Sequence, residues 1–510
     1  MKKEILYLTI MFLLFFIVSY TYSIFKNTIV GSLTANVNNW SFKANVTNGV
    51  VYNDGYKVKL NGTSGTISVN LNTIGSSNNV GFIIELPNDE SIKYYEDSTF
   101  TKLINNNMYI GNINKNTSNS INIYYKSENN INKDIVIKIK ANILYIYGVK
   151  RNINSTSTVW ERINDSVGLV ANAVKPDNTN PKNDFDNLYP WSDIKSYNYN
   201  ATTKEITAWI GDSNFKFDGT NGEVLTYIPG FYYKREVVDE VEYQYISNCI
   251  QPGYSYSEPF SVGRYKISGI VYDDSKNVDF ENSMAHSKNG SYIGCYLTRE
   301  DFRKIIKKLG NEFSQMDYHR FLLQMLYLVE YADYDSQKLL GLGSVNMYLV
   351  STGGTDELGM KSGCLVDDTQ HSMIYRGIED IYGNGFELLD GINMKDYQAY
   401  INYDYTTYES DVFDGKYQPL GYVNSSESGY ITKLGYDSKN PLIGLPISTG
   451  KEEESIKDYY KYSIKTGGLR PGKDKILDKE GMWSFFADYI IKNVIIRQYP
   501  ACSRLIRHHN

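Results

Sequence analysis

The chain has 510 residues, more than one hydrophobic core usually organises, so length alone predicts two to four domains. Hydrophobic residues make up 42% and charged residues 22%, which is the composition of a folded globular protein. There are 52 Lys and Arg against 58 Asp and Glu, and the resulting net charge of -6 argues against a nucleic-acid binder. Four cysteines exclude a disulfide-dense scaffold and a cysteine-rich zinc module.

Tyrosine is the unusual component, with 47 Tyr against 20 Phe. The first interpretation is genome composition, because Tyr has AT-rich codons and an AT-rich genome would produce the same excess. A recognition surface rich in tyrosine is the second interpretation, because Tyr supplies a large amphipathic contact area at a small entropic cost.

Residues 1–25 predict a signal peptide or a membrane anchor. Lys2 and Lys3 precede a nearly unbroken apolar run from Ile5 to Ile24, and about 20 apolar residues can cross a hydrocarbon core. The sequence leaves open whether this segment is cleaved or retained. Both alternatives place everything after Phe25 outside the cell, so export is expected.

Residues 26–147 predict a β-sandwich stalk domain. Apolar residues alternate with polar ones, as in antiparallel sheets with one buried face, at Ile67, Val69 and Leu71 and again at Ile135, Ile137 and Ile139. Turn signals such as Asn61-Gly62 separate the runs. Within this region, residues 31–45 resemble exported β-sandwich proteins of low-GC Gram-positive bacteria.

Two helices are expected after residue 297. Thr298 followed by Asp301 indicates a capping box, and Gly310 a stop. Basic residues on this helix predict a solvated face: Arg303, Lys304, Lys307 and Lys308. A second helix is expected from near Asp317, with one buried face that carries Phe321, Leu322, Met325, Leu328 and Val329.

The remaining motifs follow one another in an order that matters more than any one of them. They are Asn183-Asp-Phe-Asp186, Tyr189-Pro-Trp191, Ile228-Pro-Gly-Phe-Tyr-Tyr-Lys234, Val262-Gly-Arg-Tyr265, Leu326-Tyr-Leu-Val-Glu-Tyr-Ala-Asp333, Tyr375-Arg-Gly-Ile-Glu379, Gly383-Asn-Gly-Phe-Glu387 and Ser503-Arg-Leu-Ile506.

In this order they resemble the C-type-lectin-fold tail and receptor-binding proteins of phages and prophages that infect Gram-positive bacteria. Related proteins include the variable proteins of diversity-generating retroelements and, more distantly, the formylglycine-generating (sulfatase-modifying) enzymes. The resemblance implies a short-strand N-terminal part over residues 148–257 and a C-type-lectin-like domain over residues 258–510. The fold class expected for the whole chain is therefore α+β and β-rich.

The resemblance does not imply catalysis here. Formylglycine-generating enzymes hold copper with a local C-terminal cysteine pair, whereas Cys502 has no cysteine near it in sequence. Cys249, Cys295 and Cys364 lie far away along the chain, which leaves a disulfide and simple burial both open. The five histidines do not form a metal motif: His319, on a helix, is expected to be a packing or surface histidine, and His508 and His509 are expected to fray. Glu379, Asp380 and Glu387 become scaffold residues by the resemblance. We expect no enzyme activity, no cofactor and no metal site.

The candidate binding surface lies between the last strands, because function in such folds is carried by loops on a rigid frame. Phe485, Ile491, Val494 and Ile496 fit a strand core. The residues expected to face a ligand are Trp483, Asp488, Tyr489, Lys492, Arg497 and Tyr499, which include the types enriched at binding hot spots. A second candidate is the tyrosine-rich stretch 397–408, in which strand alternation would place Tyr403 and Tyr405 on one face.

The function expected from these features is that of an exported, membrane-anchored or secreted cell-surface protein of a Gram-positive-type bacterium or its prophage. Its head would bind a protein or glycan ligand on another cell or phage, without nucleic acid. Two alternatives stand beside it: a prophage tail or receptor-binding protein, whose phage relatives are often trimers, and an enzyme of the formylglycine-generating type.

Overall fold

The computed structural model describes residues 41–52, 55–275, 277–295, 297–346, 349–462, 466–471, 482–488 and 501–509. The chain divides into two compact units. The first comprises Met1–Tyr145 and Ser247–Tyr254, and the second comprises Ile146–Ile246 and Ser255–Asn510. The predicted N-terminal segment 1–25 lies outside the described residues. In the part of the chain that is described, no helix is both long and apolar enough to span a membrane.

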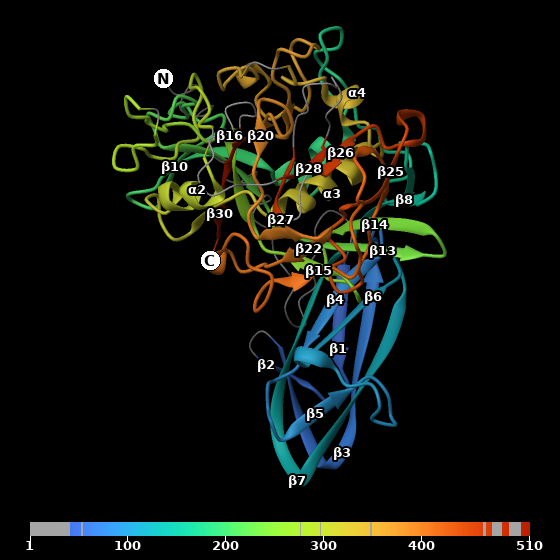
Figure 1. Cartoon of the computed structure of the whole chain (residues 1–510). Coiled ribbons are helices and arrows are strands. Elements are labelled where there is room, and N and C mark those ends of the chain that lie inside the picture. The colour runs from blue at the N-terminus through green and yellow to red at the C-terminus, as the bar shows by residue number, and fades with distance from the viewer. Residues whose placement is uncertain are drawn as a thin grey trace, which may run out of the picture. The chain divides into compact units, whose positions relative to one another are not determined.

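The first unit is built on antiparallel strands in the order β1-β3-β7-β4-β6, with β2 added beside β3 and β5 beside β7 (Figure 1). The strands are β1 (Ser41–Val46), β2 (Val50–Tyr52), β3 (Gly55–Ile74), β4 (Val80–Glu85), β5 (Ile92–Tyr95), β6 (Met108–Ile113) and β7 (Ser118–Ile143), and a single 3-10 turn, η1 (Asn105–Asn107), precedes β6.

Strand β7 joins two parts of this unit. It pairs with β3 as far as Ile137 and with β4 from Lys138 onward. The inward residues of both parts form one apolar core, so the arrangement is consistent with a β-sandwich. The predicted alternation is confirmed, because Ile67, Val69, Leu71, Ile135, Ile137 and Ile139 are all buried in that core.

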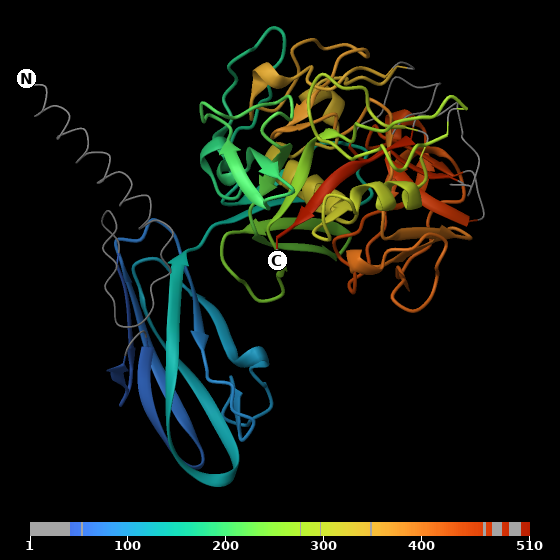
Figure 2. The ribbon, with the colours of Figure 1, turned by 90° about the vertical axis from the view of Figure 1, so that its left-hand side faces the viewer.

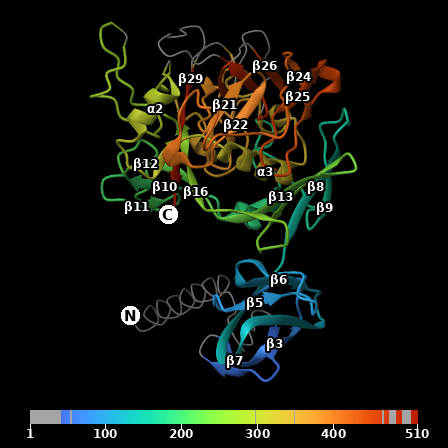
Figure 3. The same cartoon turned by 60° about the horizontal axis from the view of Figure 1, so that its bottom comes forward.

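The second unit is also rich in β-structure and contains several sheets (Figures 2 and 3). A six-stranded sheet has the order β11-β10-β12-β16-β30-β17, and a five-stranded sheet has the order β15-β13-β14-β8-β9. Their strands are β8 (Ile146–Asn152), β9 (Glu161–Asn164), β10 (Lys195–Asn200), β11 (Glu205–Trp209), β12 (Glu223–Ile228), β13 (Phe231–Val238), β14 (Val241–Ser247), β15 (Ser255–Ser257), β16 (Phe260–Lys266), β17 (Phe313–Gln315) and β30 (Arg504–His508).

An eight-stranded sheet has the order β23-β22-β21-β27-β28-β26-β24-β25, and two short pairs, β18-β19 and β20-β29, complete the unit. These strands are β18 (Ile374–Tyr375), β19 (Ile378–Glu379), β20 (Phe386–Glu387), β21 (Ile392–Lys395), β22 (Gln398–Ile401), β23 (Gln418–Pro419), β24 (Gly429–Leu434), β25 (Pro446–Gly450), β26 (Tyr459–Tyr462), β27 (Thr466–Pro471), β28 (Phe485–Asp488) and β29 (Ala501–Cys502).

The helices are α2 (Arg299–Ile306), α3 (His319–Tyr331) and α4 (Ser336–Leu340), and the 3-10 turns are η2 (Asp184–Asn187), η3 (Trp191–Asp193), η4 (Asp356–Leu358), η5 (Tyr405–Thr407) and η6 (Glu452–Glu454). The capping box at Thr298 is confirmed: its side chain accepts from the Asp301 amide, and the Asp301 carboxylate accepts from the Thr298 amide.

Two helix predictions need correction. Helix α3 is buried on every side and not on one face only, because sheets and loops cover it all round. On α2 the solvated face does not include Arg303, whose guanidinium is largely covered and pairs with the buried Asp390. Lys304, Lys307 and Lys308 are exposed as expected.

The C-terminal strand has a central place in the second unit. Strand β30 lies beside β16 (Figure 1) and between β16 and β17, with Phe260 opposite His508 and Phe313 opposite Arg507. Residues 504–508 therefore belong to the frame. The expected fraying of His508 and His509 is wrong, because His508 pairs with Phe260 and the His509 ring lies 2.7 Å from the Ser261 hydroxyl.

Candidate functional site

Several of the sequence motifs meet at one buried carboxylate, that of Glu330 on α3. Arg376 donates to it through Nε at 3.1 Å and through Nη2 at 2.7 Å, and the Tyr375 hydroxyl donates at 3.0 Å. The Asn183 amide donates at 2.7 Å from a third motif. Because Glu330 has no exposed surface, these donors replace the water that a carboxylate would otherwise bind.

A second convergence surrounds Arg504 on β30. Its Nε donates to Glu387 at 2.8 Å. Its two terminal nitrogens donate to main-chain oxygens of Gly263, Arg264, Glu379 and Asp380 at 2.7–3.1 Å. The motif at the end of the chain thereby ties together β16, the β19 region and β20.

Glu379 is buried as well, and it accepts from the amides of Gly353 and Thr355 and from the Thr355 hydroxyl. Burial and the neighbouring Asp380 raise the pKa of Glu379 to about 7. Its position and partners are those of a residue that fixes the 353–355 loop. Glu330, Arg376, Arg504, Glu387 and Glu379 are thus buried parts of the frame.

The first predicted binding surface is described only in part. Trp483 is 3% exposed and packs edge-on against Tyr327 and Tyr334, with ring centroids 5.5 and 4.8 Å away. It is therefore a core residue, and its expected place at a surface is wrong. Asp488 is the last residue of β28. Tyr489, Lys492, Arg497 and Tyr499 lie outside the described residues.

The second predicted surface is present, but not as a strand. Strand β22 ends at Ile401, Tyr403 follows in an irregular segment and Tyr405 begins the 3-10 turn η5. The expected alternation is wrong because the Asp404 side chain accepts from the Thr406 amide and caps η5, which turns the chain away from the sheet. The two tyrosines nevertheless belong to one cluster of rings.

This cluster, which we name the tyrosine–histidine surface, consists of Tyr318, His319, Tyr403, Tyr405 and His508. Tyr405 stacks on His508 with ring centroids 3.5 Å apart and an interplanar angle of 5°. Tyr403, which is 41% exposed, contacts Tyr318 edge-on at 5.0 Å. His319 lies beneath, at 4.2 Å from Tyr318 and 5.4 Å from His508.

A buried carboxylate, that of Asp317, holds His319 in place through a hydrogen bond. The Asp317 carboxylate lies 2.6 Å from His319 Nδ1 and accepts from the Tyr408 hydroxyl at 2.9 Å. Burial alone would raise the pKa of Asp317, but the facing His319 outweighs it, so the pKa lies below its usual value. Burial lowers the pKa of His508 to about 4, so the ring under Tyr405 is neutral at pH 7.

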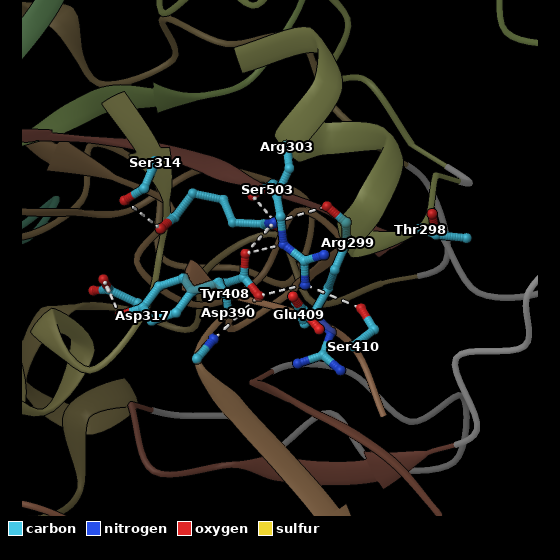
Figure 4. A network of polar contacts seen from close by, with 12 residues as sticks. Thr298, Arg299, Arg303, Ser314, Asp317, Asp390, Tyr408, Glu409, Ser410 and Ser503 are labelled. Carbon is cyan, nitrogen blue, oxygen red and sulfur yellow. Dashed lines mark hydrogen bonds and ion pairs between the residues drawn. The ribbon is translucent and has the colours of Figure 1, made fainter. Parts of the chain in front are cut away.

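The loop that carries Tyr403 and Tyr405 is also held at its far end. Arg303 on α2 donates to both oxygens of Asp390, at 2.7 and 2.8 Å, and to the Ser410 hydroxyl at 3.0 Å (Figure 4). Asn393 donates to the main-chain oxygen of Glu409 at 3.1 Å. Together with Tyr408 on Asp317, these contacts attach residues 408–410 to the frame of the unit.

Sequence reasoning missed the histidines of this site. His319 was expected to be a packing or surface histidine and His508 a frayed terminal one. His319 contacts its neighbours Asp317 and Tyr318, but Tyr405 and His508 lie about 100 positions apart, and sequence spacing holds no signal for such a contact. The tyrosine-rich composition of 397–408 was the single available signal, and it led to two of the five residues.

The site is suited to stacking and hydrogen bonding. It offers ring faces, tyrosine hydroxyls and the Asn440 side chain, whose oxygen accepts from the Tyr403 hydroxyl at 3.3 Å. Among the described residues, no group of three or more His, Cys, Asp or Glu side chains has a geometry that could hold a metal ion. No known family model matches the chain, and no curated protein is similar to it.

Proposed function

We propose that this protein is an exported cell-surface ligand-binding protein, adhesin or receptor-like, with a C-type-lectin-like head. The head corresponds to the second unit, and the ligand is a protein or a glycan. The observation that carries the proposal is the stacked pair of Tyr405 and His508, which presents a tyrosine ring on a rigid base. The head binds without making or breaking bonds.

The physical support is preorganisation. A ring that is already stacked loses little side-chain freedom when it meets a ligand, so more of the contact energy appears as affinity. Polar anchors at Asp317 and Asp390 hold the loop in the same way before binding. The neutral state of His508 keeps a charge out of the stack.

Binding of the labelled full chain to a glycan microarray and to intact bacterial and eukaryotic cells tests the proposal. We expect Tyr403→Ala with Tyr405→Ala to weaken binding about 30-fold, as for a hot-spot pair. Tyr292→Ala is the matched control, since Tyr292 is the most exposed tyrosine described and lies outside the defined surface. Equal binding by the double variant and the wild type would refute the assignment.

Fractionation of the producing cells distinguishes the proposal from the prophage alternative. Recovery in the cell envelope or the medium supports the exported protein. Recovery in phage-like particles supports a tail or receptor-binding protein with the same head, and would overturn the cell-surface assignment while leaving the binding site in place.

A further inference from the structure

Two cysteines that are about 200 positions apart come together in the second unit. Cys295 and Cys502 belong to the same small buried apolar cluster as Ile293, and Leu349 packs against it. Both cysteine side chains are almost completely buried, and in the structure both are thiols. The other two cysteines are elsewhere: Cys249 is in the first unit, and Cys364 lies beside Gly341.

The backbone fixes this proximity. The Gly294 amide donates to the Ile267 main-chain oxygen at 2.7 Å, and the Ile267 amide donates to the Ser503 main-chain oxygen at 2.8 Å. The residues next to the two cysteines therefore hydrogen-bond the same residue. Strand β29 is itself held by parallel pairing with β20, in which Cys502 lies opposite Glu387.

The surroundings make these thiols unreactive once the protein has folded. Burial raises the pKa of Cys502 to about 11, and burial together with the neighbouring Cys502 raises the pKa of Cys295. Because the thiolate is the reactive species, oxidation of the finished core is slow. In an oxidising environment, a disulfide between Cys295 and Cys502 therefore forms while the chain folds. The closed core then protects it from reduction.

We propose that Cys295 and Cys502 are a modification site at which a disulfide fastens the C-terminal segment to the frame. The oxidant is a small-molecule or protein disulfide. One cysteine thiolate attacks it and releases one thiol, and the second thiolate then attacks the mixed disulfide and releases the other. Two cysteine thiols and one disulfide thus become one protein disulfide and two thiols.

The cross-link would act on the part of the chain that leads into β30. Strand β30 begins at Arg504, two positions after Cys502, and ends at His508 in the tyrosine–histidine surface. A covalent tie at Cys502 resists withdrawal of this strand from the sheet. The inference does not depend on the proposed ligand, because it concerns the frame and is measured without any ligand.

The test uses the full chain folded in a glutathione redox buffer, then denatured with a chelator and alkylated with or without prior reduction. Intact mass is expected to show two alkylated cysteines without reduction and four after it, and peptide mapping to show Cys295 joined to Cys502. Four alkylated cysteines without reduction, or a bond between any other pair, would overturn the proposal. This readout is made on the wild-type protein, so it does not depend on a variant that folds.

Matched variants extend the test. Cys249→Ser with Cys364→Ser is expected to keep the cross-link and to melt several degrees higher when oxidised than when reduced. Cys295→Ala is expected to abolish both the cross-link and the difference in melting temperature. A difference that survives in Cys295→Ala would show that another pair is responsible and would overturn the assignment.

Discussion

Removal of the Arg376 charge provides the most direct test of the buried frame. In Arg376→Met, Glu330 keeps the Tyr375 and Asn183 donors but loses the guanidinium that binds its carboxylate with two hydrogen bonds, at 2.7 and 3.1 Å. Removing one partner of a buried ion pair typically costs about 3–5 kcal/mol, since the other charge stays buried without compensation. We expect a loss of that size in the free energy of unfolding of the second unit.

Guanidinium chloride titration followed by tryptophan fluorescence measures this loss, because four of the five tryptophans lie in the second unit. The double variant Glu330→Gln with Arg376→Met removes both charges and is expected to recover about half of the loss. Lys304→Met is the control, since its partner Glu300 and Lys304 itself are both exposed. Its midpoint should match that of the wild type.

A free energy of unfolding for Arg376→Met within about 1 kcal/mol of the wild-type value would contradict the prediction. A double variant as unstable as Arg376→Met would also contradict it. The destabilisation would then come from lost packing of the arginine stem and not from the unpaired carboxylate.

Three further predictions concern other parts of the frame. Glu379 has a folded-state pKa of about 7, above its usual value, so it contributes a penalty that appears as the pH rises from about 4.5 to 7. We expect about 3 kcal/mol of stability to be lost over that window, and Glu379→Gln to remove this pH dependence in denaturant titrations at several pH values. Thr298→Ala, which deletes the α2 cap, is expected to cost about 1 kcal/mol in the same titration, and no loss would show that the capping box is not stabilising. Tyr408→Phe removes a donor from the buried Asp317 and is expected to cost about 1–3 kcal/mol; an unchanged stability would mean that Asp317 is satisfied without it.

Local patterns in the sequence predicted local structure well. Alternation over Ile67, Val69 and Leu71 identified a strand with one buried face, and Thr298 with Asp301 identified a helix start. Both signals act between residues a few positions apart, where backbone geometry alone fixes which side chains meet.

The failures have one local and one long-range cause. The alternation of tyrosines at 403 and 405 was misleading, because the Asp404 cap and the stack on His508 determine that segment, and His508 is about 100 positions away. Tryptophan is a residue type enriched at binding hot spots, but Tyr327 and Tyr334 cover Trp483. Residue type does not reveal which remote ring will cover another.

The roles of the motif residues explain why the motifs alone say little about binding. The motif residues Arg376 and Arg504 form their hydrogen bonds with buried carboxylates and main-chain oxygens. Such residues tolerate few replacements, because each one leaves an unpaired buried group. Tyr403 is 41% exposed and its hydroxyl donates to the Asn440 side chain, so its replacement leaves no buried carboxylate unpaired. Because the motif residues hold the frame, they do not identify a ligand, and the proposed binding is to be tested by measurement at the tyrosine–histidine surface.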